Sequence, residues 1–90
     1  MRNFKFEDKL HKIIVKLLKK DKKKYEIILK KVDEIINCFD INHYKNLKSP
    51  MSEFKRVHID NSFVLIFKYD IISNTVIFYD LDHHDKIYLK

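Results

Sequence analysis

The sequence predicts an α+β fold, in which an N-terminal helical hairpin packs on a three- to four-stranded antiparallel sheet. Two observations support this prediction. Apolar residues recur with the helical period as far as Phe39, and short apolar runs separated by Asp, Asn and Ser then replace that period. Helices that precede a run of antiparallel strands form a layer on one face of the sheet. The length of 90 residues predicts a single domain over 1–90.

The first half of the chain is predicted to form two amphipathic helices. We expect one at about 6–19 and the other at about 22–38, with a tight turn near Asp21. Asp21 is a suitable N-cap for the second helix, because its carboxylate can accept a hydrogen bond from a backbone N–H of the first turn. A short strand over 2–5 could precede the helices. The apolar positions with helical period are Phe6, Leu10, Ile13, Ile14, Leu17 and Leu18, then Tyr25, Ile28, Leu29, Val32, Ile35, Ile36 and Phe39.

The second half is predicted to form a loop and an antiparallel meander. Residues 40–52 are rich in Asn, Asp and Ser and contain the only proline, which indicates a loop. Three strands are expected at 53–60, 62–70 and 74–81. The run 63–67 is apolar on both alternating faces, so it should be the central strand and be covered on both sides.

The composition excludes several classes of function. Because the chain has no Gly, it has no glycine-rich phosphate loop, and no cofactor is predicted. Its single cysteine cannot form an internal disulfide, which fits a reducing cytosol. No apolar stretch has the length of a membrane span and no signal-peptide pattern opens the chain, so we expect a cytoplasmic protein with no membrane partner.

The net charge of +6 is concentrated in the first half of the chain. Residues 1–48 carry 14 basic and 7 acidic side chains, whereas residues 49–90 carry 5 basic and 6 acidic ones. A basic block of this kind suggests a polyanion as partner. An ordinary lysine-rich solvated surface explains the same count equally well.

Polar residues of the first long strand are predicted to face away from the helices. Side chains alternate along a strand, so the residues of 53–60 divide between two faces. One face carries Lys55, Val57 and Ile59, and the other carries Phe54, Arg56, His58 and Asp60. The apolar pair most naturally contacts the helices. Arg56 and His58 are therefore expected on the open face of the sheet.

Three more residues come from segments that we expect near this face. His84 and Tyr88 are four residues apart and share a face if 83–88 turns helically. His43 lies in the loop before the first long strand and could close over the same face. The predicted site thus draws on three separate segments.

Imidazole and guanidinium groups suit cleavage of an RNA phosphodiester without a metal. One group must deprotonate the 2′-hydroxyl, a second must protonate the departing 5′-oxygen, and positive charge must stabilise the phosphorane oxygens. Histidine is the side chain whose unperturbed pKa lies closest to neutral. A metal site is not predicted, because His83 and His84 would point apart in an extended chain and no Cys-x-x-Cys pair is present. His11 is interpreted as a surface residue and Cys38 as a small buried apolar one.

The segments HYKNL (43–47), KRVHID (55–60), FVLIFKYD (63–70) and HHDKIY (83–88) together resemble the RelE/ParE toxin superfamily, and within it the YafQ-type mRNA interferases. The resemblance implies a short strand, two helices and a three-strand meander. It also implies a ribosome-dependent endoribonuclease that cleaves mRNA in the ribosomal A site. An acidic antitoxin would be its partner, in a hetero-oligomer.

The resemblance assigns roles one residue at a time. His43, His58, and His84 followed by Tyr88 match catalytic positions of the YafQ type, and Arg56 matches an arginine of the wider superfamily. We expect Arg56, Lys45, Lys48 and Lys55 to bind RNA. The family has a catalytic Asp four residues after the strand histidine, and this chain has Ser62 at that position. Asp60 or Asp85 would therefore have to orient the imidazoles in its place.

Each of these residues also has a simpler explanation. A lone strand histidine is more often a satisfied polar group, and Tyr88 would by default be a core aromatic. Arg56 could form a structural ion pair with Asp60 or Asp82. Catalysis is favoured over these explanations because the residues occur together in the order found in the family. Three alternatives stay open: a non-catalytic ParE-like toxin that acts on DNA gyrase, a nucleic-acid-binding module of the same fold, and a toxin that has lost its activity through Ser62.

Overall fold

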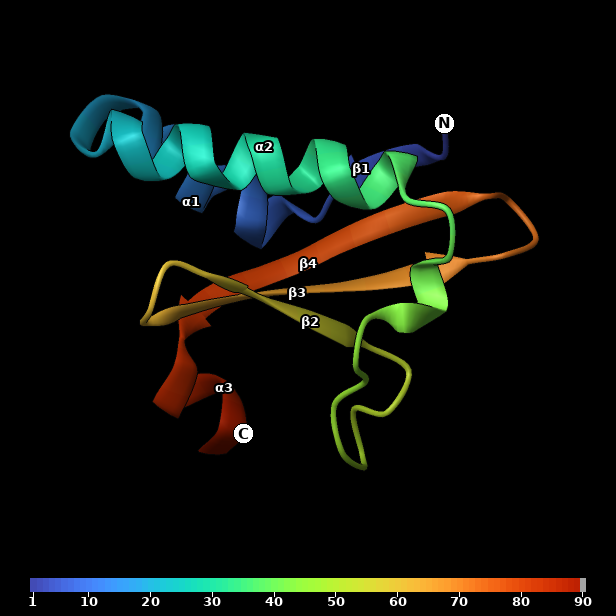
Figure 1. The fold of residues 1–90 in the computed structure, drawn as a ribbon. Helices are drawn as coiled ribbons and strands as arrows, with labels where there is room; N and C mark the ends of the chain where they lie inside the picture. The colour runs from blue at the N-terminus through green and yellow to red at the C-terminus, as the bar shows by residue number, and fades with distance from the viewer. Residues whose placement is uncertain (90) are drawn as a thin grey trace.

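A four-stranded sheet carries two helices on one face, while a loop and a short C-terminal helix lie on the other (Figure 1). The computed structural model describes residues 1–89, with side chains as far as Lys86. The elements in chain order are β1 (Asn3–Phe6), α1 (Asp8–Lys20), α2 (Lys22–Asn37), the 3₁₀ turn η1 (Ile41–His43), β2 (Lys55–Ile59), β3 (Phe63–Asp70), β4 (Thr75–His83) and α3 (His84–Leu89).

The predicted α+β class is confirmed, with one difference in the sheet. The strand order is β1-β4-β3-β2, and β2, β3 and β4 form the expected antiparallel meander. The short first strand exists, but β1 pairs with β4 in parallel, so the sheet is mixed. Sequence pattern does not reveal this pairing, because it depends on where the helical hairpin returns the chain.

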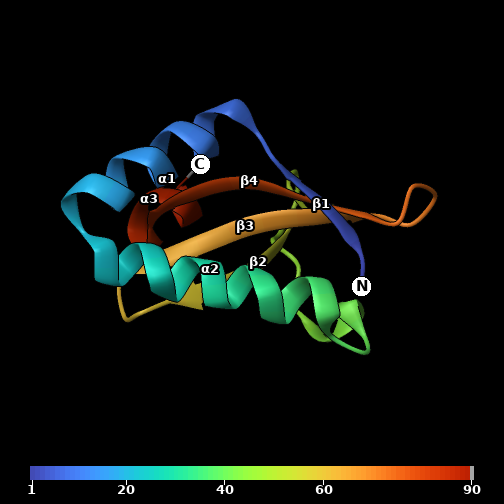
Figure 2. The same ribbon diagram turned by 90° about the horizontal axis from the view of Figure 1, so that it is seen from above.

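The α1–α2 connection is built around one side chain, as the sequence predicts. The Asp21 N–H donates to the Leu17 carbonyl at 2.8 Å and ends α1. Its Oδ1 accepts from the Lys24 N–H at 3.1 Å and caps α2. Seen from the helical side, α1 runs along β4 and α2 runs across β3 and β2 (Figure 2).

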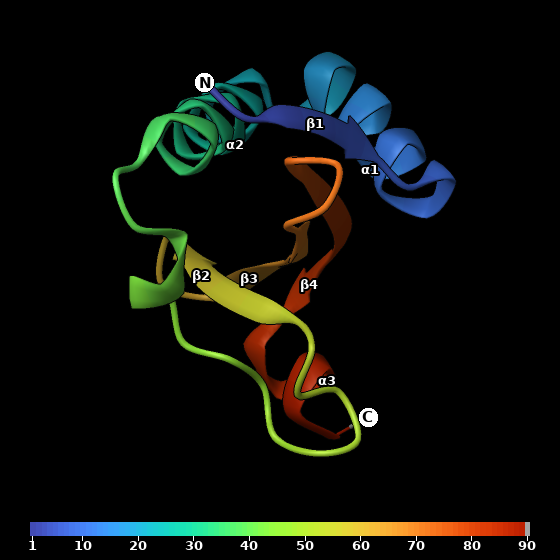
Figure 3. The same ribbon diagram turned by 90° about the vertical axis from the view of Figure 1, so that its right-hand side faces the viewer.

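Apolar side chains fill both faces of β3. On the helical side, Leu65 and Phe67 are fully buried. On the open face, Val64 and Ile66 lie beneath the loop between η1 and β2, which bends back under the sheet (Figure 3). The expected covering of this strand on both sides is therefore confirmed. The helical-side core comprises Leu10, Ile14, Ile28, Val32, Ile35, Ile36, Ile41, Ile59, Leu65, Phe67, Val76, Phe78 and Leu81, and the open-face cluster comprises Leu47, Phe54, Val64 and Ile66 with Met51.

Asp and Asn form the reversals of a chain that has no Gly. Asp60 ends β2 with φ of 61° and Asn74 precedes β4 with φ of 51°. Both residue types tolerate the left-handed region better than most others. The C-terminal segment turns helically from His84 as α3, which is the condition that the sequence left open. None of the described helices contains an apolar segment long enough to cross a membrane.

Candidate active site

Two of the predicted catalytic histidines meet at one end of the sheet. His58 projects from β2 and His84 opens α3, and their rings stack with centroids 5.6 Å apart and planes inclined by 26°. Local backbone contacts explain this meeting. The β3–β4 ladder continues to Phe63 opposite His83, and the His84 N–H then donates to the Ser62 carbonyl at 2.8 Å. This bond holds the start of α3 against the β2–β3 turn.

The histidine pair opens onto a polar cavity of about 350 Å³. His58 is exposed, and the His84 side chain is 48% exposed, so both rings are accessible. The cavity lies between the β2–β3 turn and the β4–α3 junction, and its described lining is His58, Asn61, Ser62, His83, His84 and Asp85. A phosphate group brought to this cavity would meet two imidazoles at once.

The structure separates the two candidate acids. Asp85 lines the cavity, and its Oδ1 lies 3.6 Å from Nδ1 of His84. Asp60 lies in the β2–β3 turn, where its Oδ1 accepts from the Asn61 N–H at 2.9 Å and its Oδ2 lies 3.9 Å from Nζ of Lys24. Asp85 is therefore the better placed of the two to orient an imidazole.

Strand register places Arg56 on the same face as His58, as predicted. Arg56 pairs with Ile66 and His58 pairs with Val64. The side chains of Val57 and Ile59 pack into the helical-side core instead. Arg56 is partly buried and His58 is exposed.

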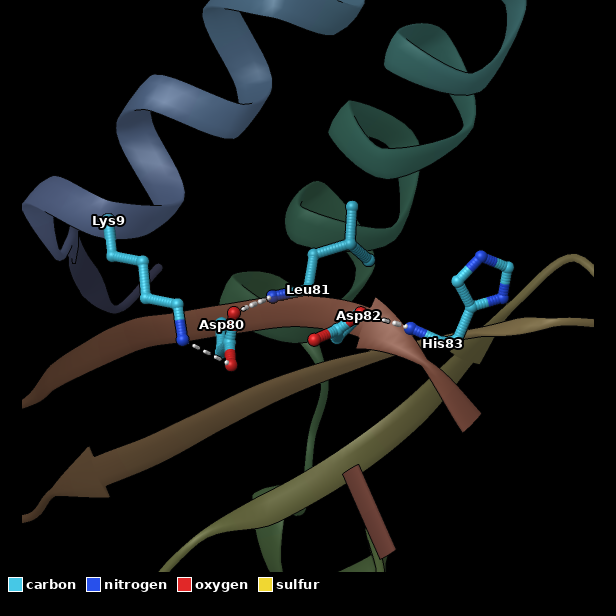
Figure 4. A network of polar contacts seen from close by, with 5 residues as sticks. All are labelled: Lys9, Asp80, Leu81, Asp82 and His83. Carbon is cyan, nitrogen blue, oxygen red and sulfur yellow. Dashed lines mark hydrogen bonds and ion pairs between the residues drawn. The ribbon is translucent and has the colours of Figure 1, made fainter. Parts of the chain in front are cut away.

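The same register reveals two acids that the sequence-based prediction of the site left out. Asp80 lies opposite Ile66, and Asp82 lies opposite Val64, so both share the open face with Arg56 and His58. Figure 4 shows their side chains on the side of β4 away from the helices. Their two-residue spacing, continued by His84, is the strand signal that could have found them.

Asp80 is held in an ion pair that reaches around the edge of the sheet. Only 1% of Asp80 is exposed. Nζ of Lys9, on α1, lies 3.1 Å from its Oδ2, while the Leu81 N–H donates to its Oδ1 at 2.9 Å (Figure 4). The contact fastens the start of α1 to β4 beside the open face.

His43, which the sequence suggested could close over the same face, is not among the described residues that line the cavity of the histidine pair. Its Nδ1 donates to the Asp40 carbonyl, and its ring lies 3.9 Å from that of Tyr44. Tyr44 packs edge-on against Phe67, whose β2 partner is Lys55, so η1 lies near the opposite end of β2 from His58 (Figure 1). The length of the loop did not specify which end of the strand it approaches.

Partial burial raises the pKa of Tyr44, beside His43. The negative charges of Cys38 and Glu34 raise this pKa further, and Arg2 lowers it. Tyr44 is therefore held in its neutral phenol form beside the core.

Lys55, which was expected to bind RNA, lies on the face that strand alternation predicts, with Val57 and Ile59, and is buried there. It is only 8% exposed, and its Nζ donates to Oδ1 of Asn46 at 3.0 Å and to the Tyr44 carbonyl at 3.4 Å. Alternation along β2 turns it to the helical side, where it anchors the loop, so we leave it out of the RNA-binding set. Lys45 and Lys48 are exposed on that loop.

Tyr88 falls within α3, but its side chain lies outside the described part of the structure. Among the residues that the structure does describe, no three His, Cys, Asp or Glu side chains are grouped so as to hold a metal ion.

Several solved structures have the same fold, and the intact RelBE toxin–antitoxin complex of Escherichia coli is among them. The chain resembles the YoeB–YefM complex from Staphylococcus aureus, with a TM-score of 0.76 and 17% identity over 93% of this chain and 98% of that one. A metal-bound toxin from Helicobacter pylori gives a TM-score of 0.76 and 21% identity over 97% and 99%. YafQ from Escherichia coli gives a TM-score of 0.66 and 13% identity, over 98% of this chain and 99% of that one. At these identities the likeness establishes the fold.

A relative in sequence establishes the family. The chain is 58% identical over 81 residues to the protein named "Putative toxin RelE4" of Methanocaldococcus jannaschii. The aligned residues cover 90% of this chain and 84% of that protein. An uncharacterized protein of Methanosarcina mazei is also 58% identical, over 73 residues. No family model matches. The chain belongs to the RelE toxin family.

Proposed function

We propose that this protein is a ribosome-dependent endoribonuclease that cleaves mRNA by metal-independent acid–base catalysis. The observation that carries the proposal is the stacking of His58 on His84 at one accessible polar cavity. Arg56 extends from the same face of the sheet. One small region thus provides two proton-transfer groups and a cation.

The reaction needs no further group beyond this set. One imidazole takes the proton of the 2′-hydroxyl, whose oxygen attacks phosphorus, and the other gives a proton to the departing 5′-oxygen. Arg56 stabilises the charge of the phosphorane oxygens. Asp85 orients His84, because its Oδ1 lies 3.6 Å from Nδ1 of that ring. It thereby takes the role of the catalytic aspartate of the YafQ type, whose position is occupied by Ser62 in this chain.

An antitoxin is the proposed partner, in a cytoplasmic hetero-oligomer. The solved RelBE structure from Escherichia coli, which shares this fold, is a toxin–antitoxin complex. The charge of +6 suits an acidic partner and, in its absence, ribosomal RNA phosphates.

The test is expression of the chain without a partner, with growth measured and mRNA 5′ ends mapped. We expect growth arrest with new 5′ ends, and a loss of roughly 10²- to 10⁴-fold in cleavage rate for His58→Ala and for His84→Ala. His11→Ala is the matched control, because His11 is exposed on α1 and is not among the described residues that line the cavity. His43→Ala shows whether that residue takes part despite its distance from the pair.

Intact mRNA in arrested cells, or cleavage by both site variants at the parental rate, would refute the nuclease proposal. Arrest with DNA damage and uncut mRNA would indicate a gyrase-directed toxin instead. No arrest and no cleavage by the parent chain would indicate a toxin that has lost activity.

A further inference from the structure

His83 has no role in the proposed reaction, yet it lines the same cavity as the catalytic pair. It is exposed, and strand alternation turns its side chain away from that of His84. Figure 4 shows it projecting from the end of β4 on the side of Leu81, toward the helices. A ring in this position cannot share the proton transfers of His58 and His84.

An aromatic neighbour holds the His83 ring. Phe63 is its register partner on β3, and the two ring centroids lie 4.4 Å apart with planes inclined by 31°. The Lys24 ammonium lies over the Phe63 ring, 3.7 Å from its centroid. Only 18% of the Lys24 side chain is exposed, so this cation is fixed against the ring rather than free in solvent. Lys24, Phe63 and His83 form an ordered row that we call the aromatic row.

The aromatic row connects the catalytic cavity with a basic surface. Lys24 belongs to the first turn of α2, directly after the α1–α2 connection. That connection lies at the same end of the molecule as the β2–β3 turn and the start of α3 (Figure 1). Its exposed lysines, which we call the interhelical lysines, are Lys19, Lys20, Lys22 and Lys23.

Cations beside an accessible aromatic face form the usual surface for single-stranded nucleic acid. Lysines attract the phosphates, and flat rings stack on unpaired bases. We propose that His83, held flat by Phe63, stacks on a nucleobase of the RNA next to the scissile phosphate and so determines where the chain cuts. This inference rests on the proposed endoribonuclease function and adds a positioning residue to it.

The test compares binding of two short single-stranded RNA oligonucleotides of equal length, one normal and one abasic near its centre, to the purified full chain. For His83→Ala we expect roughly 5- to 100-fold weaker binding of the normal oligonucleotide and unchanged binding of the abasic one. His83→Phe keeps the flat ring and should retain parental affinity. His11→Ala controls for the loss of an exposed histidine for which the described part of the chain shows no ring contact.

The inference would be overturned if the parent and His83→Ala bound the normal oligonucleotide equally. It would also be overturned if His83→Phe bound that oligonucleotide as weakly as His83→Ala, or if the parent bound neither RNA. Cut positions mapped for the same variants should shift with His83→Ala and stay in place with His83→Phe.

Failure of the nuclease proposal can be distinguished from failure of the stacking proposal. Base-dependent binding without cleavage by the parent refutes the nuclease alone, and parental cleavage at unchanged positions by His83→Ala refutes the stacking role alone.

Discussion

Asp80 is a carboxylate that the fold buries and pairs. One oxygen meets Nζ of Lys9 at 3.1 Å and the other accepts from the Leu81 N–H. A buried charge needs such partners, because desolvation otherwise costs several kcal/mol, on the order of the whole stability of a small domain. The pair therefore supports the fold next to the site rather than the chemistry.

We expect Asp80→Asn to lower the free energy of unfolding by about 1–3 kcal/mol, because the amide cannot replace the charge-assisted bond to Lys9. Urea denaturation measures this change. Asp85→Asn is the matched control, since the Asp85 side chain is 94% exposed and its loss should change the free energy of unfolding by less than about 0.5 kcal/mol. Equal stability of the two variants would show that the Lys9–Asp80 contact contributes nothing.

Single residues also show how far sequence alone leads. Alternation along β2 correctly predicted Arg56 and His58 on the open face, since that rule depends only on neighbouring residues. The same rule places Lys55 on the inner face with Val57 and Ile59, although its charge suggested an RNA-binding role. Hydrogen bonds to Asn46 and Tyr44 make its burial tolerable, and these partners come from the loop.

One aspartate, Asp70, accepts two hydrogen bonds within the β3–β4 turn. The Ser73 hydroxyl donates to Oδ2 of Asp70 at 2.9 Å, and the Ile72 N–H donates to its Oδ1 at 3.1 Å. The bond from Ser73 is the main cause that lowers the pKa of Asp70 below its ordinary value. Ile71 and Ile72 in the same turn are 78% and 95% exposed and add little to its packing.

Because the folded pKa lies below the unfolded one, the stabilisation from Asp70 is complete above the unfolded pKa and is lost as pH falls through the folded value. We expect the protection factors of the turn amides, which correct for the slower intrinsic exchange at low pH, to fall over that acidic interval, and Asp70→Asn to remove this pH dependence. An NMR titration of the carboxyl group measures the pKa directly. Ser73→Ala should bring it back toward the ordinary value, and an unchanged titration in that variant would contradict the assigned cause.

The distribution of charge over the molecule predicts how it meets RNA. Each lysine that neutralises a phosphate of a single strand contributes about 0.7 to the slope of log affinity against log salt concentration. Replacing Lys20, Lys22 and Lys23 by Gln should therefore reduce that slope by about 2, if all three contact phosphate.

The matched control is replacement of the exposed lysines Lys5, Lys12 and Lys30, which lie outside the α1–α2 connection. RNA affinity measured from low to moderate salt gives both slopes. Equal slopes for the two triple variants would mean that charge acts through the whole surface and that the interhelical lysines form no track toward the site.

The sequence by itself determined the two long helices, the three strands of the meander, their order and the face that β2 turns to the helices. These follow from period, capping and turn chemistry, which are properties of neighbouring residues. The tertiary structure alone decided that His58 meets His84, that His43 lies at the other end of β2, that Asp80 is buried against Lys9 and that β1 pairs in parallel with β4. Each of these outcomes depends on contacts between segments far apart in the chain, where register and the path of a loop, rather than local pattern, fix which side chains come together.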